Sequence, residues 1–206
     1  MKVLLFNGSP KANGNTAFAL SQMAQVFAAE GVETEIIQVG SQLIRGCIGC
    51  GSCYKSGQCV FDDLVNAVAA KLDTADGIVV GSPVYYASPN GTLSSFLDRL
   101  FYSTGKIDKT MKVGTAVVCA RRGGCTAAFD VLNKYFTISN MPVASGSYWN
   151  MIHGGMPVEA AQDLEGIRTV RNAAKNMTFL MRSIAMGKET IGLPEPEPKV
   201  FTNFIR

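Results

Sequence analysis

The sequence is poor in histidine, tryptophan and charge, and it has no long hydrophobic run. Its 206 residues include one histidine and one tryptophan, charged residues make up 17%, and the formal net charge is +3. Lys and Arg form no basic stripe, so we expect no nucleic-acid partner. No stretch approaches the roughly 18 apolar residues of a membrane span, and no charged leader precedes the first apolar run. We therefore expect a cytoplasmic protein with no membrane association.

Three familiar motifs are also missing. The dinucleotide fingerprint G-x-G-x-x-G is absent after the first apolar run, where Gly8 is followed by a Ser-Pro pair. The P-loop needs Gly-Lys-Ser/Thr, whereas Gly14 is followed by an Asn-Thr pair. No G-x-S-x-G elbow occurs, so a hydrolase triad has no support, and His153 is most simply a loop residue.

The composition suits one domain followed by a tail. Apolar residues make up 47%, enough for a sizeable core in a chain of this length. We expect a single domain over residues 1–191, with a cysteine-rich loop at 46–59, and a C-terminal tail at 192–206. The tail carries Phe201, Phe204 and Ile205, too apolar for a free end, so we expect it to pack on its own domain or on a neighbouring subunit.

Apolar runs and helical patterns alternate along the chain. The expected strands are Val3–Asn7, Thr34–Val39, Gly77–Gly81, Val113–Cys119 and Pro142–Ser147. The expected helices are Thr16–Glu30, Asp62–Leu72 (capped by Asp62 or Asp63), Thr92–Tyr102, Ala127–Ser139 and Glu159–Met186. This alternation predicts an α/β fold, a doubly wound five-stranded parallel sheet with helices on both faces. Ligands of such sheets bind beyond the carboxyl ends of the strands.

The loop Gly8–Thr16 joins the first strand to the first helix and is rich in hydroxyl and amide groups. Backbone N–H groups and the positive end of a helix can bind a phosphate there. With the dinucleotide and P-loop patterns absent, a terminal monophosphate fits best. FMN is the common cofactor of that kind, and flavodoxin-like sheets carry it at this edge. The alternative is that these are only turn and N-cap residues.

Two further loops are expected at the same edge. The loop Ser82–Gly91 has two prolines and a glycine, which favour an irregular backbone open to a ligand, and two tyrosines suited to a ring system. In the loop Arg121–Thr126, Gly123 and Gly124 allow close backbone approach. Arg121 could offset charge on a reduced flavin or meet a nicotinamide phosphate. A surface turn and a solvated basic turn are the respective alternatives.

These motifs resemble a known family. The chain looks like a member of the NAD(P)H-dependent FMN reductase family of flavodoxin-like proteins. The resemblance is carried by the segments GSPKANGNT, SPVYYASPNGTLSSFLDR and ARRGG, and by YWN followed by HG. The resemblance implies two sets of FMN-binding residues, the phosphate set Ser9, Lys11, Asn15 and Thr16 and the ring set Pro83, Val84, Tyr85 and Tyr86. Lys11 stands where the family often has Arg, which keeps the charge but loses a bidentate phosphate contact.

The resemblance also implies an activity. NAD(P)H as cosubstrate would pass hydride to bound FMN, which would then reduce a quinone, a flavin or another small acceptor. The cofactor carries this chemistry, so no catalytic side chain is expected. A flavin bound at a sheet edge needs a protein surface on its open side, and the family resemblance suggests that a partner protomer supplies that surface. We therefore expect a homodimer or a tetramer.

Six cysteines without an export signal indicate thiols, metal ligands or redox chemistry. Four of them, Cys47, Cys50, Cys53 and Cys59, form C-x2-C-x2-C-x5-C, a spacing like that of [4Fe–4S] loops, although the usual proline after the last cysteine is absent. Neighbouring glycines allow the tight turns of such a wrap. Zinc usually takes two separated pairs, and a loop of free thiols at an interface is the remaining alternative.

The phrase CIGCGSCYKSGQCVFDD is similar to the iron–sulfur flavoproteins, a branch that transfers electrons between a cubane cluster and FMN. The phrase also resembles relatives that bind FMN alone, so it leaves the cluster open. The alternative function is accordingly an electron carrier that couples FMN to a [4Fe–4S] cluster and a ferredoxin-like partner.

Overall fold

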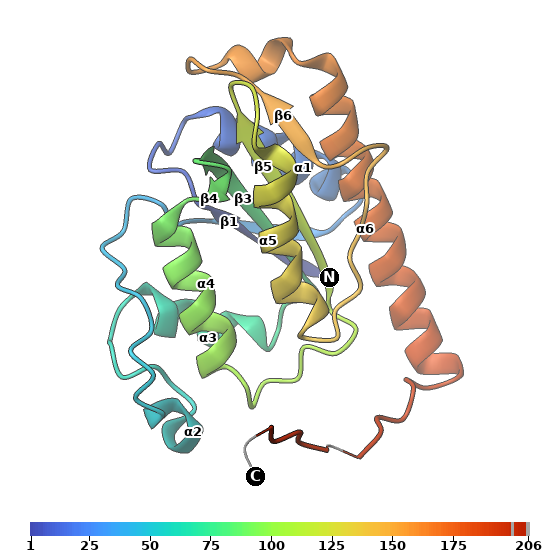
Figure 1. The fold of residues 1–206 in the computed structure, drawn as a ribbon. Coiled ribbons are helices and arrows are strands. Elements are labelled where there is room, and N and C mark those ends of the chain that lie inside the picture. Colours follow the sequence, from blue (N-terminus) through green and yellow to red (C-terminus); the bar gives the residue numbers. More distant parts are fainter. Residues whose placement is uncertain (199, 205–206) are drawn as a thin grey trace.

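The computed structural model describes residues 1–198 and 200–204, and a central sheet lies between two layers of helices (Figure 1). The strands are β1 (Lys2–Asn7), β2 (Glu33–Gln38), β3 (Gly77–Tyr85), β4 (Ser88–Pro89), β5 (Val113–Ala120) and β6 (Met151–His153). The helices are α1 (Asn15–Ala29), α2 (Ser52–Ser56), α3 (Leu64–Leu72), α4 (Gly91–Ser103), α5 (Cys125–Thr137) and α6 (Leu164–Thr190), with a 3₁₀ turn at Glu159–Gln162.

The strand order is β2-β1-β3-β5-β6, and every pair along it is parallel. β4 pairs antiparallel with the end of β3. This is the order of doubly wound sheets of the flavodoxin type. The prediction of five parallel strands with helices on both faces is therefore confirmed.

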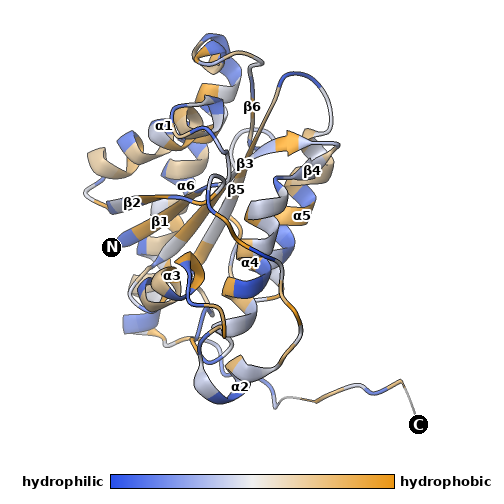
Figure 2. Ribbon diagram, turned by 90° about the vertical axis from the view of Figure 1, so that its left-hand side faces the viewer, coloured by the Kyte–Doolittle hydropathy of each residue, from blue (hydrophilic) through white to orange (hydrophobic). Residues whose placement is uncertain are grey.

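Alternation along the strands divides the core in two. On β1, Leu4 and Phe6 pack with α3, α4 and α5, whereas Val3 and Leu5 pack with α1 and α6. Figure 2 shows the two helical layers on either side of the sheet. Phe6 meets Phe96 of α4 edge to face, with ring centroids 5.2 Å apart. Burial on both faces explains why β1 and β5 read as continuous apolar runs.

The fifth strand lies elsewhere than predicted, and the assignment of Pro142–Ser147 is wrong. Within that segment Val143 forms a single bridge to Gly114, and the chain then leaves the sheet edge. The segment departs because the side chain of Asn150 fills the edge, donating to Thr115 Oγ1 at 2.9 Å and to the Ala116 carbonyl at 3.1 Å. The edge strand resumes as β6, beside the end of β5.

The loop predicted after Gly81 is partly wrong as well. β3 continues to Tyr85 and turns back through Tyr86 and Ala87 into β4. These two turn residues have φ of 49° and 59°, as in a type I′ hairpin. Neither is glycine, so the turn carries backbone strain. The hairpin pairs backbone groups that we had expected to be free.

Two helix starts depend on aspartate caps. Asp63 accepts from the Val65 N–H at 3.0 Å, which confirms it as the N-cap of α3. Asp163 accepts from the Gly166 N–H at 2.8 Å, so α6 begins at Leu164 and the predicted start at Glu159 is wrong. The intervening residues form the 3₁₀ turn instead.

The tail beyond α6 has no helix or strand over residues 192–198 and 200–204. Phe201 and Phe204 are exposed, so the expected packing on their own domain is wrong, and packing on a neighbouring subunit stays a prediction. Ile205 lies outside the described residues. Among the described helices none is long and apolar enough to cross a membrane.

Candidate functional site

A cavity opens where β1, β3 and β5 end. It brings together eight of the expected cofactor residues, Ser9, Lys11, Asn15, Thr16, Pro83, Val84, Tyr85 and Arg121. They come from the loop before α1 and its first turn, from the end of β3 and from the loop after β5, which the parallel topology brings to one edge. Gly14, Cys119, Ala120, Gly154, Gly155 and Pro157 complete the lining.

One end of this cavity suits an anion. The N-cap of α1 is Gly14, and no side chain in the described structure caps that helix start. Its first N–H groups therefore keep their hydrogen-bonding capacity and the positive end of the helix dipole. Lys11 and Arg121 add two cations to the same lining. A phosphate group matches this arrangement.

The loop before α1 is held close to the sheet. The Gly8 N–H donates to the Gly81 carbonyl at 2.8 Å, and a Cβ at Gly8 would lie 2.4 Å from a methyl carbon of Leu93. Ser9 is buried, and its Oγ accepts from the Lys11 N–H at 3.1 Å. Glycine is thus required where the loop crosses β3 and α4.

The side chain of Asn15 makes two hydrogen bonds within the protein, to residues that follow β6. Its Nδ2 donates to the Met156 carbonyl at 2.8 Å, and its Oδ1 accepts from the Ala160 N–H at 3.3 Å. The side-chain amide therefore ties α1 to the loop after β6, and its expected contact with a phosphate stays a prediction. Its backbone N–H still belongs to the first turn of α1.

The loop after β6 forms a wall that the motif reasoning missed. Its Gly154 approaches Asn15 so closely that a Cβ would lie 2.7 Å from Asn15 Nδ2. The N–H groups of Gly155 and Met156 donate to Glu159 Oε2 at 2.7 and 2.8 Å, which lowers the pKa of that carboxyl group. The consecutive glycines Gly154 and Gly155 were the feature of the sequence that could have indicated this wall.

Three expected residues lie outside the cavity lining. Tyr86 is fully exposed at the tip of the hairpin, beside the partly exposed Tyr85 of the wall. Gly123 and Gly124 follow Arg121 but do not reach the cavity. Gly124 has φ of 91° and lies against Ala87, where a Cβ would come within 2.9 Å of the Ala87 Cα. Its role here is to let α5 start against the hairpin turn.

Cys119 forms part of the cavity wall and is not a reactive thiol. Burial, the nearby Cys125 and Asp163 together raise its pKa to about 12. The thiol therefore stays neutral across the physiological range.

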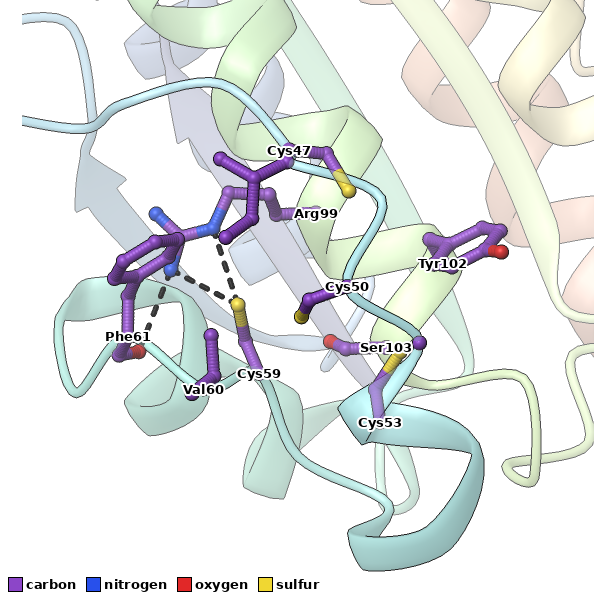
Figure 3. Close-up of a pocket in the computed structure, with 11 residues that line it drawn as sticks. Cys47, Cys50, Cys53, Cys59, Val60, Phe61, Arg99, Tyr102 and Ser103 are labelled. Carbon is purple, nitrogen blue, oxygen red and sulfur yellow. Dashed lines mark hydrogen bonds between the residues drawn. The ribbon is translucent and has the colours of Figure 1, made fainter.

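A second, smaller cavity is lined by the cysteine motif. Cys47, Cys50, Cys53 and Cys59 all line it, together with residues of α4 (Figure 3). The loop turns at three glycines with positive φ, Gly49, Gly51 and Gly57, at 66°, 69° and 74°, so the expected tight turns are present. Four thiols around one cavity are a suitable donor set for an iron–sulfur cluster. In the described part of the chain, however, no group of three or more His, Cys, Asp or Glu residues is gathered closely enough to hold a metal ion.

One basic side chain is buried against this cavity. Arg99 of α4 donates to Cys59 Sγ and forms a two-point ion pair with Asp63, at 2.6 and 3.0 Å. Burial acts to lower the pKa of Arg99, but the bonds to Asp63 and Cys59 outweigh it and hold the pKa above its ordinary value. On the exposed side, bonds from Ser52 lower the pKa of the Cys50 thiol.

Known proteins are similar to this chain over most of its length. The family model of NADPH-dependent FMN reductase matches residues 1–155. An iron–sulfur flavoprotein of Methanocaldococcus jannaschii is 31% identical over 191 residues, covering 89% of this chain and 99% of that protein. One of Archaeoglobus fulgidus is 38% identical over 206 residues, covering 95% and 96%.

Solved structures share the fold at low sequence identity. An archaeal flavodoxin has a TM-score of 0.55 at 17% identity, covering 86% of this chain and 99% of its own. The apo form of an NADH:FMN oxidoreductase has a TM-score of 0.62 at 18% identity, covering 86% and 88%. The resemblance seen in the sequence is thereby confirmed: this chain belongs to the NADPH-dependent FMN reductase family of flavodoxin-like flavin oxidoreductases.

Proposed function

We propose that this protein is an iron–sulfur flavoprotein that transfers electrons between FMN and a ferredoxin-like partner. The observation that carries the proposal is the second cavity, which Cys47, Cys50, Cys53 and Cys59 line and where Arg99 donates two N–H bonds to Cys59 Sγ. Relatives named iron–sulfur flavoproteins that align over most of the chain support it.

At the first cavity, the chain's own groups match the parts of FMN. Lys11, Arg121 and the open start of α1 would bind the phosphate by charge and N–H donation. Val84 and Tyr85 would lie along the flavin ring, with the loop after β6 as the opposite wall. Bound FMN supplies both one-electron and two-electron chemistry.

At the second cavity, the four thiols would serve as ligands, and a [4Fe–4S] cluster supplies one-electron transfer when bound. Two of the thiols, Cys47 and Cys50, are exposed, which leaves this site open to a protein partner. Free thiols in such numbers fit a reducing compartment, so we propose a cytoplasmic location.

The two cavities lie at opposite ends of α4. The cysteine site contacts its last turn, through Arg99, Tyr102 and Ser103, whereas the FMN site adjoins the hairpin before its first turn. Figure 1 shows α2 and β4 well separated along the molecule. The thirteen residues of α4 span about 20 Å at 1.5 Å per residue. This separation favours a homodimer or tetramer in which electrons also pass between protomers.

A second candidate is direct reduction of FMN by NAD(P)H, followed by transfer to a quinone, a flavin or another small acceptor. The partly exposed Tyr85 at the cavity wall favours it, because one side of the ring would be open to a second planar group. The two functions are compatible, since both use the same flavin.

One anaerobic preparation tests both candidates. Purified protein is titrated with FMN and analysed for iron, sulfide and its visible spectrum. We expect one FMN and four iron per chain, and Cys53→Ser should lose iron while retaining FMN. Cys125→Ser, outside the motif, is the matched control and should retain both. Flavin without iron in the wild-type protein would exclude the cluster. Flavin that NAD(P)H fails to bleach would exclude the second candidate.

A further inference from the structure

The guanidinium of Arg99 is arranged to act on a sulfur ligand. We propose that Arg99 is a positioning residue that fixes Cys59 by two N–H···S bonds and raises the reduction potential of the cluster held there. The inference rests on the proposed cluster at the cysteine site, and it assigns a role to a residue outside the cysteine motif.

Two N–H groups of Arg99 contact the same sulfur atom. Arg99 Nε and Nη2 both lie 3.2 Å from Cys59 Sγ, so one edge of the planar guanidinium faces the sulfur (Figure 3). The Arg99 side chain is fully buried. The two N–H groups of that edge, the fork, converge on one acceptor, a planar geometry that a lysine ammonium does not reproduce.

The remaining groups hold the guanidinium in place. Nη1 and Nη2 donate to the two oxygens of Asp63 at 2.6 and 3.0 Å. Nη2 also lies 3.3 Å from the Phe61 carbonyl, and the guanidinium carbon lies 5.1 Å from the centre of the Phe61 ring. Asp63 in turn caps α3. The fork therefore stays aimed at Cys59 without side-chain rearrangement.

An ion pair with Asp63 alone would not require the second edge to face a sulfur. A neutral thiol is a weak acceptor, whereas a thiolate or a metal-bound sulfur is a strong one, and charged acceptors make the stronger bonds. Two buried donors aimed at Cys59 Sγ thus match an anionic, ligating sulfur better than a free thiol.

The same contact has a consequence for redox chemistry. Reduction adds negative charge to a cluster and its sulfurs. N–H bonds to ligand sulfurs and a nearby positive charge stabilise the reduced state and raise the potential. Burial of Arg99 limits the solvent screening of its charge. A purely structural tie between the loop and α4 would leave the potential unchanged.

Arg45 provides a matched control. Its guanidinium carbon lies 4.8 Å from the centre of the same Phe61 ring, but it is exposed. Arg45→Gln therefore removes one positive charge beside the same Phe61 ring without removing the fork. Arg99→Gln removes both the charge and the fork, and Arg99→Lys removes the fork alone.

The test is the cluster midpoint potential of anaerobic holoprotein, from redox titration monitored by EPR, with iron, sulfide and FMN counted for each variant. At the wild-type midpoint we expect the reduced-to-oxidised ratio to fall about tenfold in Arg99→Gln, a shift of about −59 mV for one electron. We expect at least a threefold fall in Arg99→Lys, and less than twofold in Arg45→Gln.

The outcomes separate the inference from the proposed function. A wild-type protein without iron contradicts the proposed cluster itself. A wild-type protein with full iron, and an Arg99→Gln shift no larger than that of Arg45→Gln, overturns the role of Arg99 alone. If Arg99→Gln fails to fold, Arg99→Lys decides: a shift indistinguishable from that of Arg45→Gln overturns the inference.

Discussion

The side-chain amide of Asn15 donates a hydrogen bond of 2.8 Å to the carbonyl of Met156, 141 positions later in the chain. A second bond, from the Ala160 N–H to Asn15 Oδ1, closes the contact at 3.3 Å. Asn15 begins α1, whereas both partners lie in the loop after β6 and its 3₁₀ turn. One side chain thus fixes the wall of the first cavity relative to the end where α1 begins.

Asn15→Ala should weaken FMN binding about tenfold. The substitution removes two partly exposed hydrogen bonds, together about 1–2 kcal/mol, and tenfold in affinity corresponds to about 1.4 kcal/mol. Quenching of flavin fluorescence during an FMN titration measures the effect. Gln22→Ala is the control. Gln22 lies on α1, as Asn15 does, but it accepts a bond from Arg171 of α6 and does not line the cavity. Equal affinities for the two variants would contradict the role of Asn15.

Lys11→Gln should discriminate between two flavins. Lys11 lies at the anion-binding end of the cavity, so its charge should act on the phosphate and not on the ring. We expect the affinity for FMN to fall about tenfold at low salt, about 1.4 kcal/mol, and the affinity for riboflavin to stay unchanged. The FMN effect should shrink at high ionic strength.

The same titration on Lys188→Gln supplies the control, because Lys188 is an exposed cation in the last turn of α6. A parallel loss of FMN and riboflavin affinity in Lys11→Gln would place Lys11 elsewhere than at the phosphate.

Parallel topology explains why much of the site could be predicted. Once the apolar runs at Val3 and Val113 are taken as central strands, the loops that follow them must meet at one edge. Ser9 and Arg121, more than a hundred positions apart, accordingly line one cavity. The cysteine spacing indicated that one metal centre could be wrapped by the four thiols. The structure places all four at one cavity, and the metal centre stays a prediction.

What could not be predicted depends on long-range side-chain contacts. Asn150 displaces the chain from the sheet edge by bonding to Thr115 and Ala116, and nothing near Pro142 in the sequence signals this. Arg99 reads as a polar position on an amphipathic helix, yet it is buried because Asp63 and Cys59 lie opposite it. Such partners become visible only when the fold brings them together.

Asn150→Ala should lower the free energy of unfolding by about 2–4 kcal/mol. Asn150 is buried and makes three bonds, two to β5 and one from the Gly146 N–H at 3.1 Å. Each buried group left without a partner costs about 1–3 kcal/mol. Urea denaturation followed by circular dichroism measures the loss.

Asn176→Ala is the matched control for that measurement. Asn176 is exposed and donates to the Ser145 carbonyl at 2.7 Å, so it ties down the same loop from the solvent side. Its loss should cost less than about 1 kcal/mol. A similar cost for both variants would mean that Asn150 does not anchor the sheet edge.

Cys119 should make stability fall with alkaline pH. Its folded pKa is raised from 9.0 to about 12, chiefly by burial. Above pH 9 the unfolded thiol loses its proton while the folded thiol keeps it, so the folded state binds more protons. The stabilisation that the raised pKa of Cys119 gives to the folded state is complete below pH 9. It is lost as pH rises toward 12, at up to about 1.4 kcal/mol per pH unit.

In urea denaturation between pH 8 and 11, the difference in unfolding free energy between the wild type and Cys119→Ala should therefore shrink as pH rises. Val117→Ala truncates a buried, non-titrating neighbour on β5, and its difference from the wild type should stay constant. A constant difference for Cys119→Ala as well would show that this thiol titrates normally and is not buried beside the flavin cavity.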